Sequence, residues 1–198
     1  MAVHPLSVLV FLVAISMGTA MIYDTFFTRR DGPCPTIPAL PNFNVSRYVG
    51  YWYESRRFPF PFQYGTKCTK NRYFPRDDGG MNLIYYRDLI WPSNVQLRTK
   101  VKLMQTTPGT FEAYAKIAGR YVYMGTYSVI IPGYDSPTFT YSCRDIGFGL
   151  GSIEAGWVMK RATTGLTAGE ETELQSAATA LNINYSQFQP ADQSGCIV

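Results

Sequence analysis

Few side chains in this 198-residue sequence are of types that do covalent or acid–base chemistry. Its four cysteines, Cys34, Cys68, Cys143 and Cys196, could act as nucleophiles, hold a metal or form disulfides. The single histidine is His4, so a Ser-His-Asp triad or a histidine-based metal site has no other histidine to use. The cysteines show no C-x-x-C spacing, so we expect no metal site. No motif indicates a cofactor.

Residues 1–20 have the pattern of a secretory signal peptide. Residues 6–17 form an uninterrupted apolar run, and the small residues Gly-Thr-Ala at 18–20 are suited to cleavage. The run is short for a transmembrane helix, although no Lys or Arg precedes it. We therefore expect a leader at 1–20, which carries His4 away, a single domain at 21–198, and a secreted, extracellular protein.

An even number of cysteines behind a signal peptide predicts two disulfides. Four cysteines allow three pairings, and their positions alone do not choose among them. If all are paired, no thiolate nucleophile remains. Glu54 is the only carboxylate in the strand predicted at 51–58, and one acid without a partner is not a mechanism, so we do not expect an enzyme. The formal charge of +4 is spread along the chain, which argues against nucleic-acid binding.

Hydrophobic alternation predicts eight strands, at 51–58, 66–74, 81–89, 94–104, 110–117, 121–131, 138–143 and 155–161. The clearest is 94–104, where Val95, Leu97, Thr99, Val101 and Leu103 share one face and charged residues occupy the other. Short turns rich in Pro and Gly join the strands. This pattern predicts an all-β fold, an eight-stranded antiparallel up-and-down barrel.

The pattern becomes helical after the last strand. Thr167 and Glu170 have the spacing of a capping box, and an apolar stripe follows at Leu174, Ala177, Ala178 and Leu181. We expect one C-terminal α-helix over about 168–181, packed on the outside of the barrel. Residues 21–48 and 182–198 are expected to be irregular, apart from one helical turn at 44–48.

The order of these features resembles the lipocalin family, and within it the apolipoprotein D and insect bilin-binding branch. Gly50-Tyr51-Trp52 opens the first strand and Arg161 ends the last, as in the family. The chain departs from the family at Pro132-Gly133-Tyr134, where Thr-Asp-Tyr is usual, and returns to it at Tyr141-Ser142-Cys143. The resemblance implies that Gly50, Trp52 and Arg161 form a structural motif in which the indole packs against the guanidinium. It also implies the disulfides Cys34–Cys143 and Cys68–Cys196.

A lipocalin barrel would hold one small apolar molecule. The inward-facing positions nominated by alternation are Val95, Leu97, Val101, Phe111, Ala113, Ala115, Trp157 and Met159. The facing of a second set is less clear, namely Tyr53, Tyr85, Tyr127, Val129 and Phe139. The small side chains Ala113 and Ala115 would leave volume inside the barrel. Tyrosine hydroxyls could meet a polar group of the ligand.

We therefore expect a secreted carrier of a small hydrophobic molecule such as a fatty acid, sterol, retinoid, carotenoid or bilin. The alternative is an extracellular interaction protein or a subunit of a pigment complex. The aromatic loop with Phe58, Phe60, Phe62 and Tyr64 could cover the ligand, or contact a lipoprotein or membrane surface or another chain. Asn44 and Asn184 lie in glycosylation sequons. The oligomeric state is not indicated.

Overall fold

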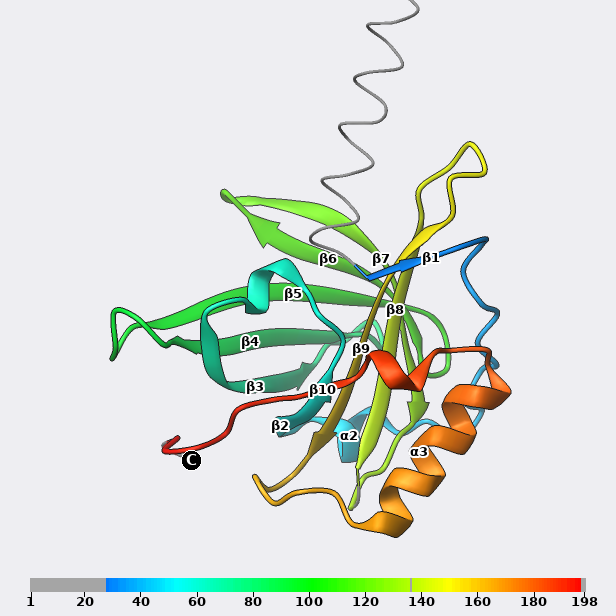
Figure 1. The fold of residues 1–198 in the computed structure, drawn as a ribbon. Helices are drawn as coiled ribbons and strands as arrows, with labels where there is room; N and C mark the ends of the chain where they lie inside the picture. Colours follow the sequence, from blue (N-terminus) through cyan, green and yellow to red (C-terminus); the bar gives the residue numbers. More distant parts are fainter. Residues whose placement is uncertain (1–27, 136, 197–198) are drawn as a thin grey trace, which may run out of the picture.

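A closed β-barrel forms the body of the molecule (Figure 1). The computed structural model describes residues 28–135 and 137–196; the predicted leader at 1–20, with His4, lies outside them. The eight barrel strands are β2 (Gly50–Arg57), β3 (Thr66–Pro75), β4 (Met81–Leu89), β5 (Gln96–Thr107), β6 (Thr110–Ile117), β7 (Arg120–Ile131), β8 (Thr138–Asp145) and β9 (Ser152–Lys160). Each pairs antiparallel with the next, and β9 also pairs with β2. The predicted eight-stranded barrel is confirmed.

The barrel wall is completed by short segments from both ends of the chain. β1 (Thr28–Arg30) pairs with the first residues of β9, and β10 (Gln189–Pro190) pairs with the end of β2. Both lie in stretches predicted to be irregular, and that prediction is wrong. The reason is that β2 pairs with β3 only as far as Tyr53 and with β9 only from its later residues, which leaves sheet edges for the ends of the chain to fill.

The C-terminal tail bridges the gap that opens between β2 and β3. The side-chain amide of Gln193 donates to the carbonyl of Glu54 on β2, at 3.0 Å, and to that of Thr69 on β3, at 2.7 Å. The Cys68 amide donates to the Asp192 carbonyl at 2.9 Å, and the Cys68–Cys196 disulfide holds the tail in place. The second disulfide joins Cys34 to Cys143. Both pairings are those that the family resemblance implied.

Two helices lie outside the strands. α3 (Ala168–Ala180) has the predicted capping box, in which Glu170 N donates to Thr167 Oγ1 and Thr167 N donates to Glu170 Oε2. Its buried residues Leu174 and Ala178 pack against the outer face of β8 and β9. The predicted helical turn is α2 (Val45–Tyr48), which is capped by Asn44. Two further single turns are η1 (Pro61–Gln63) and η2 (Tyr185–Gln187). Within the described residues, no helix has the length and apolar character needed to cross a membrane.

One end of the barrel is closed by a packed core. Aromatic and large apolar side chains fill it, including Tyr48, Trp52, Tyr73, Leu103 and Phe111, all of them at most 1% exposed. The β5–β6 turn and α2 lie at this closed end, since Leu40 N donates to Pro108 O and the Phe43 ring packs against those of Tyr48 and Phe111. The interior of the barrel is therefore packed with side chains at one end and hollow at the other.

Candidate functional site: the barrel cavity

A cavity of about 570 Å³ occupies the other half of the barrel. Some of the residues nominated from the sequence line it: Tyr85, Val101, Ala113, Ala115, Tyr127 and Trp157. Ala113 and Ala115 are both buried and leave room on the wall formed by β6. A pocket of this size lies within the range of small-molecule sites in proteins.

Other nominated residues face inward but lie outside the cavity lining. Phe111, Val129 and Met159 belong to the packed core at the closed end, where they are at most 1% exposed. Leu97 is only partly buried and pairs with Arg87 across β4 and β5. Val95 precedes β5 in the loop and is 39% exposed.

Two nominated residues face away from the interior. Phe139 pairs with Val158 in register, and both pack outside the barrel in the cluster that α3 covers. Tyr53 follows the inward-facing Trp52, so alternation directs it outward. Its ring lies 5.8 Å from the Lys70 ammonium. An inward facing for these two side chains is therefore wrong.

One wall of the cavity is polar, and of its residues the sequence analysis nominated only Tyr85. Asn71 on β3 and Tyr85 and Arg87 on β4 line it together with Thr99 on β5. Asn71 pairs with Tyr85 in register, and Tyr85 pairs with Thr99, so these three form one row across neighbouring strands. The signal for this row was available, because Met81, Leu83, Tyr85 and Arg87 alternate along the strand and carry Arg87 to the same face as Leu83.

A buried ion pair lies beside this wall. Glu54 is fully buried, and its Oε2 accepts from Arg57 Nη1 at 3.1 Å. The same Nη1 donates to Thr69 Oγ1 at 3.1 Å. Burial raises the pKa of Glu54 above its usual range, and the neighbouring Arg57 acts in the opposite direction. Glu54 thus lies inside the barrel but is engaged by Arg57.

Hydrogen bonds fix the aromatic side chains around the cavity. The hydroxyls of Tyr73 and Tyr127 lie 2.7 Å apart at the boundary with the packed core. With its amide oxygen turned toward the indole, Gln63 accepts from Trp157 Nε1 at 3.1 Å and donates to the Phe58 carbonyl at 3.0 Å. These bonds satisfy polar groups of large side chains and hold their apolar faces toward the hollow interior.

At the closed end, the motif of Gly50, Trp52 and Arg161 is assembled as expected. The Arg161 guanidinium lies 3.8 Å from the centroid of the Trp52 ring. Its Nη1 donates to the carbonyls of Val49 and Tyr51, both at 3.0 Å, and its Nη2 to those of Arg47 and Tyr48. Gly50 has a φ of +101°, and an added Cβ would lie 3.3 Å from the Arg161 side chain. Glycine here provides both the backbone conformation and the space.

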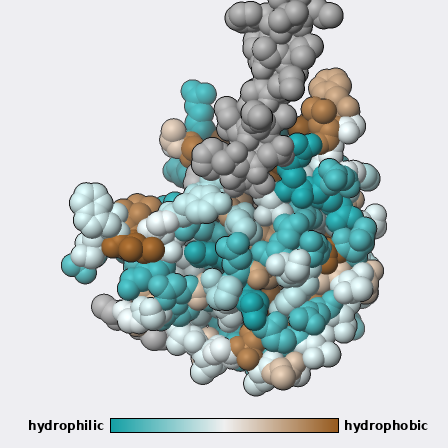
Figure 2. All heavy atoms as spheres, in the orientation of Figure 1, coloured by the Kyte–Doolittle hydropathy of each residue, from teal (hydrophilic) through white to brown (hydrophobic). Residues whose placement is uncertain are grey.

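The open end carries exposed hydrophobic side chains at the tips of the β4–β5 and β8–β9 connections, where Figure 2 shows brown atoms. Trp91 is 86% exposed in the first of these loops, and Phe148 is fully exposed in the second. Of the predicted aromatic loop, Phe60 lines the cavity and Tyr64 is exposed. Phe58 instead stacks on Phe188 outside the barrel, at 4.3 Å between ring centroids, so its predicted place at the mouth is wrong. The side chain of Phe62 lies outside the described set.

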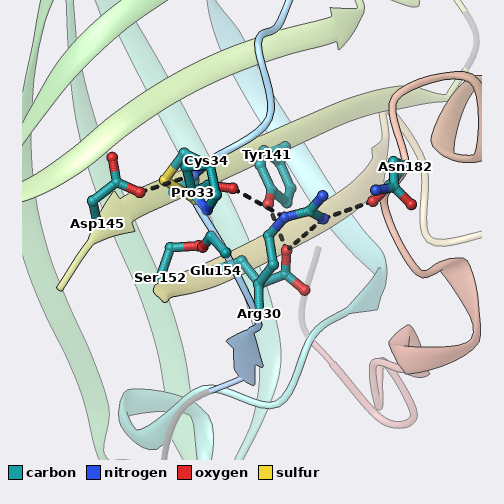
Figure 3. A network of polar contacts seen from close by, with 10 residues as sticks. Arg30, Pro33, Cys34, Tyr141, Asp145, Ser152, Glu154 and Asn182 are labelled. Atoms are coloured by element: carbon teal, nitrogen blue, oxygen red, sulfur yellow. Dashed lines mark hydrogen bonds and ion pairs between the residues drawn. A yellow bond between two sulfur atoms is a disulfide. The ribbon is translucent and has the colours of Figure 1, made fainter. Parts of the chain in front are cut away.

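A polar network fastens the N-terminal segment to the wall beside the mouth (Figure 3). Arg30 on β1 donates to the carbonyls of Pro33 and Asn182, at 3.2 and 2.6 Å, and lies 3.9 Å from Glu154. Glu154 accepts from the Tyr141 hydroxyl and is buried. Its carboxylate therefore has partners within the protein fold.

All four cysteines are in disulfides, so the chain offers no free thiol. Across residues 28–135 and 137–196, no cluster of His, Cys, Asp and Glu could hold a metal ion. What the geometry supplies is a hollow, mostly apolar interior with one polar wall.

Comparisons with known proteins give the same fold. No family model matches the chain. Apolipoprotein D of Bos taurus is 27% identical over 172 residues, which cover 83% of this chain and 85% of that protein. The structure of insecticyanin from the tobacco hornworm Manduca sexta matches with a TM-score of 0.69 at 19% identity, over 85% of this chain and 90% of that one. H1 crustacyanin from the lobster Homarus americanus matches with a TM-score of 0.64 at 18% identity, over 86% and 92%.

The closed barrel, the contact between Trp52 and Arg161, and the near full-length match to apolipoprotein D lead to one conclusion. The chain is a lipocalin related to apolipoprotein D.

Proposed function

We propose that the protein is a secreted carrier that holds one small hydrophobic molecule in the barrel cavity. The classes that fit are a fatty acid, sterol, retinoid, carotenoid or bilin. The observation that carries the proposal is the cavity of about 570 Å³ inside a closed barrel, lined largely by apolar side chains. A guest molecule would gain about 25 cal/mol for each Å² of apolar surface removed from water.

Secretion is supported by the covalent chemistry of the chain. Two disulfides and no free cysteine fit an oxidising compartment, where such bonds form and persist. Asn44 and Asn184, the two predicted glycosylation sites, are both exposed. Each uses its side-chain oxygen as a local cap, which leaves the amide nitrogen for a glycan.

Filling the cavity tests the proposal directly. We expect Ala115→Phe to reduce the affinity for an apolar probe by about tenfold or more, because the ring would occupy space that the ligand needs. The control is Ala180→Phe, which adds the same ring at an exposed position of α3. An unchanged affinity in Ala115→Phe would mean that the probe binds elsewhere.

Trp157 provides the readout because it lines the cavity, whereas Trp52 is in the packed core. The measurement is quenching of tryptophan fluorescence by cis-parinaric acid in a Trp91→Phe background, which removes the exposed indole. Saturable quenching that Trp157→Phe abolishes is the expected result. If no lipophilic probe quenches Trp157, the carrier proposal fails.

A second candidate function rests on the exposed aromatic residues at the barrel mouth. Trp91 and Phe148, with Ile90 and Leu150 beside them, present apolar surface on two separate loops, β4–β5 and β8–β9. Such a surface suits an extracellular interaction protein or a subunit of a pigment complex. Size-exclusion chromatography with light scattering separates the two functions: a monomer that binds ligand favours the carrier, and a stable assembly that Trp91→Ser with Phe148→Ser disperses favours the second.

A further inference from the structure

The polar wall of the cavity contains a cation that no acidic group in the described protein neutralises. Arg87 is 8% exposed and lines the cavity. Its Nη1 donates to Thr99 Oγ1 at 2.9 Å, and its Nε has no hydrogen-bond partner. Among the described residues, no carboxylate lies within ion-pair distance of this guanidinium.

Glu54 is the carboxylate whose charge acts on Arg87, and it already forms an ion pair with Arg57. Glu54 Oε2 binds Arg57 Nη1 at 3.1 Å while Glu54 Oε1 has no hydrogen-bond partner, so one carboxylate faces two guanidinium groups inside the barrel. Burial lowers the pKa of Arg87, which is the response of a cation that has lost water without gaining a full counter-charge. A buried cation in this condition is costly for the fold and gains from an anion.

Further polar atoms around Arg87 also have no partner within the protein. The Tyr85 hydroxyl and Asn71 Oδ1 are buried and make no hydrogen bond. The Tyr85 ring lies 5.2 Å from the Arg87 guanidinium carbon, on the same strand. Both residues line the cavity, and Arg87 Nε and the Tyr85 hydroxyl are donors buried within the same part of its wall, a pair that suits an acceptor with two oxygens.

Apolar side chains form another part of the cavity wall. Val101, Ala113, Ala115 and Trp157 face the same cavity from β5, β6 and β9. A molecule that satisfies both walls has one anionic group and a hydrocarbon body.

We propose that the cavity selects apolar carboxylic acids, with the carboxylate bound by Arg87 and the hydrocarbon body held against the apolar wall. This inference rests on the proposed carrier function and narrows it from hydrophobic molecules in general to acids. A neutral alcohol or ester of the same body fills the same volume but leaves the Arg87 charge uncompensated. A guanidinium binds a carboxylate through paired hydrogen bonds, a geometry that a neutral group does not reproduce.

A matched pair of ligands tests the selection in the unmodified chain. The probes are cis-parinaric acid and its methyl ester, titrated against the quenching of Trp157 at neutral pH. We expect the acid to bind at least about tenfold more tightly than the ester, because hydrogen bonds to a charged group contribute about 1.5–3 kcal/mol. This comparison does not depend on whether any variant folds.

Variants then assign the selection to Arg87. We expect Arg87→Met to lose about tenfold or more in affinity for the acid and to keep that for the ester within about twofold. Arg87→Lys, which keeps the charge without the planar fork, should keep part of the preference for the acid. The control is Arg144→Met, because Arg144 also lines the cavity but is exposed and donates to the Tyr123 carbonyl at 3.0 Å. It should leave the ratio of the two affinities unchanged.

Four other outcomes would each contradict a different part of the proposal. If the acid and the ester bind the unmodified protein equally, the selection for acids is wrong while the carrier function stands. If Arg87→Met weakens both probes equally, Arg87 only supports the fold. If Arg144→Met lowers the ratio as much as Arg87→Met does, the preference comes from the general positive field and not from Arg87. If neither probe binds the unmodified protein, the carrier function itself fails.

Discussion

Arg161 shows how one side chain can stabilise a whole end of the barrel. Its guanidinium lies over Trp52 and donates to four carbonyls around α2 and the start of β2. Burial lowers the pKa of Arg161, yet the ring face and the carbonyl oxygens compensate the desolvated cation. These contacts tie the last barrel strand to the segment that enters the first.

We predict that Arg161→Met destabilises the protein by roughly 2–4 kcal/mol, because it removes a cation–π contact and four hydrogen bonds from a charged donor. The measurement is urea unfolding followed by the fluorescence of Trp52. Arg161→Lys should recover only part of the loss, since one ammonium cannot cover the indole face and donate to all four carbonyls. A loss below about 0.5 kcal/mol in Arg161→Met would show that the contact is incidental.

At the scale of elements, the C-terminal tail and β1 fill the gaps that the eight barrel strands leave in the wall. β2 and β3 pair from Gly50 to Tyr53 and then separate. Gln193 bridges the gap by donating hydrogen bonds to a carbonyl on each strand. The adjacent Cys68 amide bonds to Asp192 in the same tail. The tail therefore acts as part of the wall.

Gln193→Ala should lower stability by roughly 1–2 kcal/mol, because two carbonyl groups lose their donor. Its distinctive effect should be local, namely faster hydrogen exchange of the amides at the ends of β2 and β3 with little change in β6 and β7. The control is Gln175→Ala on the exposed face of α3. Uniformly faster exchange across all strands would contradict a local role for the tail.

The eight barrel strands were predictable because each carries its own hydrophobic alternation, and their ends differ from the prediction by at most three residues. β1 and β10 were not, since three and two residues give no periodicity and their hydrogen bonds come from partner strands. The facing of Phe139 failed for another reason: α3 covers the outer face of β8, so apolar side chains are buried on the outside of this strand as well as on the inside.

The cavity was only partly predictable. Ala113, Ala115 and Trp157 are apolar in regular strands, so alternation placed them correctly. Alternation does not give depth, so it could not separate Val101 in the cavity from Phe111 in the packed core. Arg87 was missed because a charged side chain is assigned outward by default, although alternation along β4 placed it on the same face as Leu83 and Tyr85.

The molecule as a whole divides into a filled half and a hollow half, and tyrosines mark the boundary. The Tyr73 and Tyr127 hydroxyls are hydrogen-bonded to each other, and the Tyr48 hydroxyl is hydrogen-bonded to Thr138 Oγ1. All three rings are buried. Burial raises the pKa of Tyr127 to about 12, and it raises the pKa of Tyr48 and Tyr73 as well.

This predicts the alkaline limit of the fold. An unfolded tyrosine ionises near pH 10, so between about 10 and 12 the unfolded state holds fewer protons than the folded one, and stability falls as the pH rises. The tyrosinate absorbance should rise in two steps, with these three tyrosines ionising only as near-ultraviolet circular dichroism is lost. A single step at the pH of exposed tyrosines, with the circular dichroism intact, would contradict the burial of all three.

Residues from both ends of the chain complete the barrel wall. The cavity is therefore enclosed only after the C-terminal tail has been synthesised and has joined the wall. The Cys68–Cys196 crosslink spans 128 residues, and Gln193 is needed where β2 meets β3. A nascent chain that has not yet released its tail from the ribosome thus has all eight barrel strands but an incomplete wall. On the carrier function proposed above, a ligand is then enclosed only once residues 189–196 have joined the wall, in the compartment where the crosslinks form.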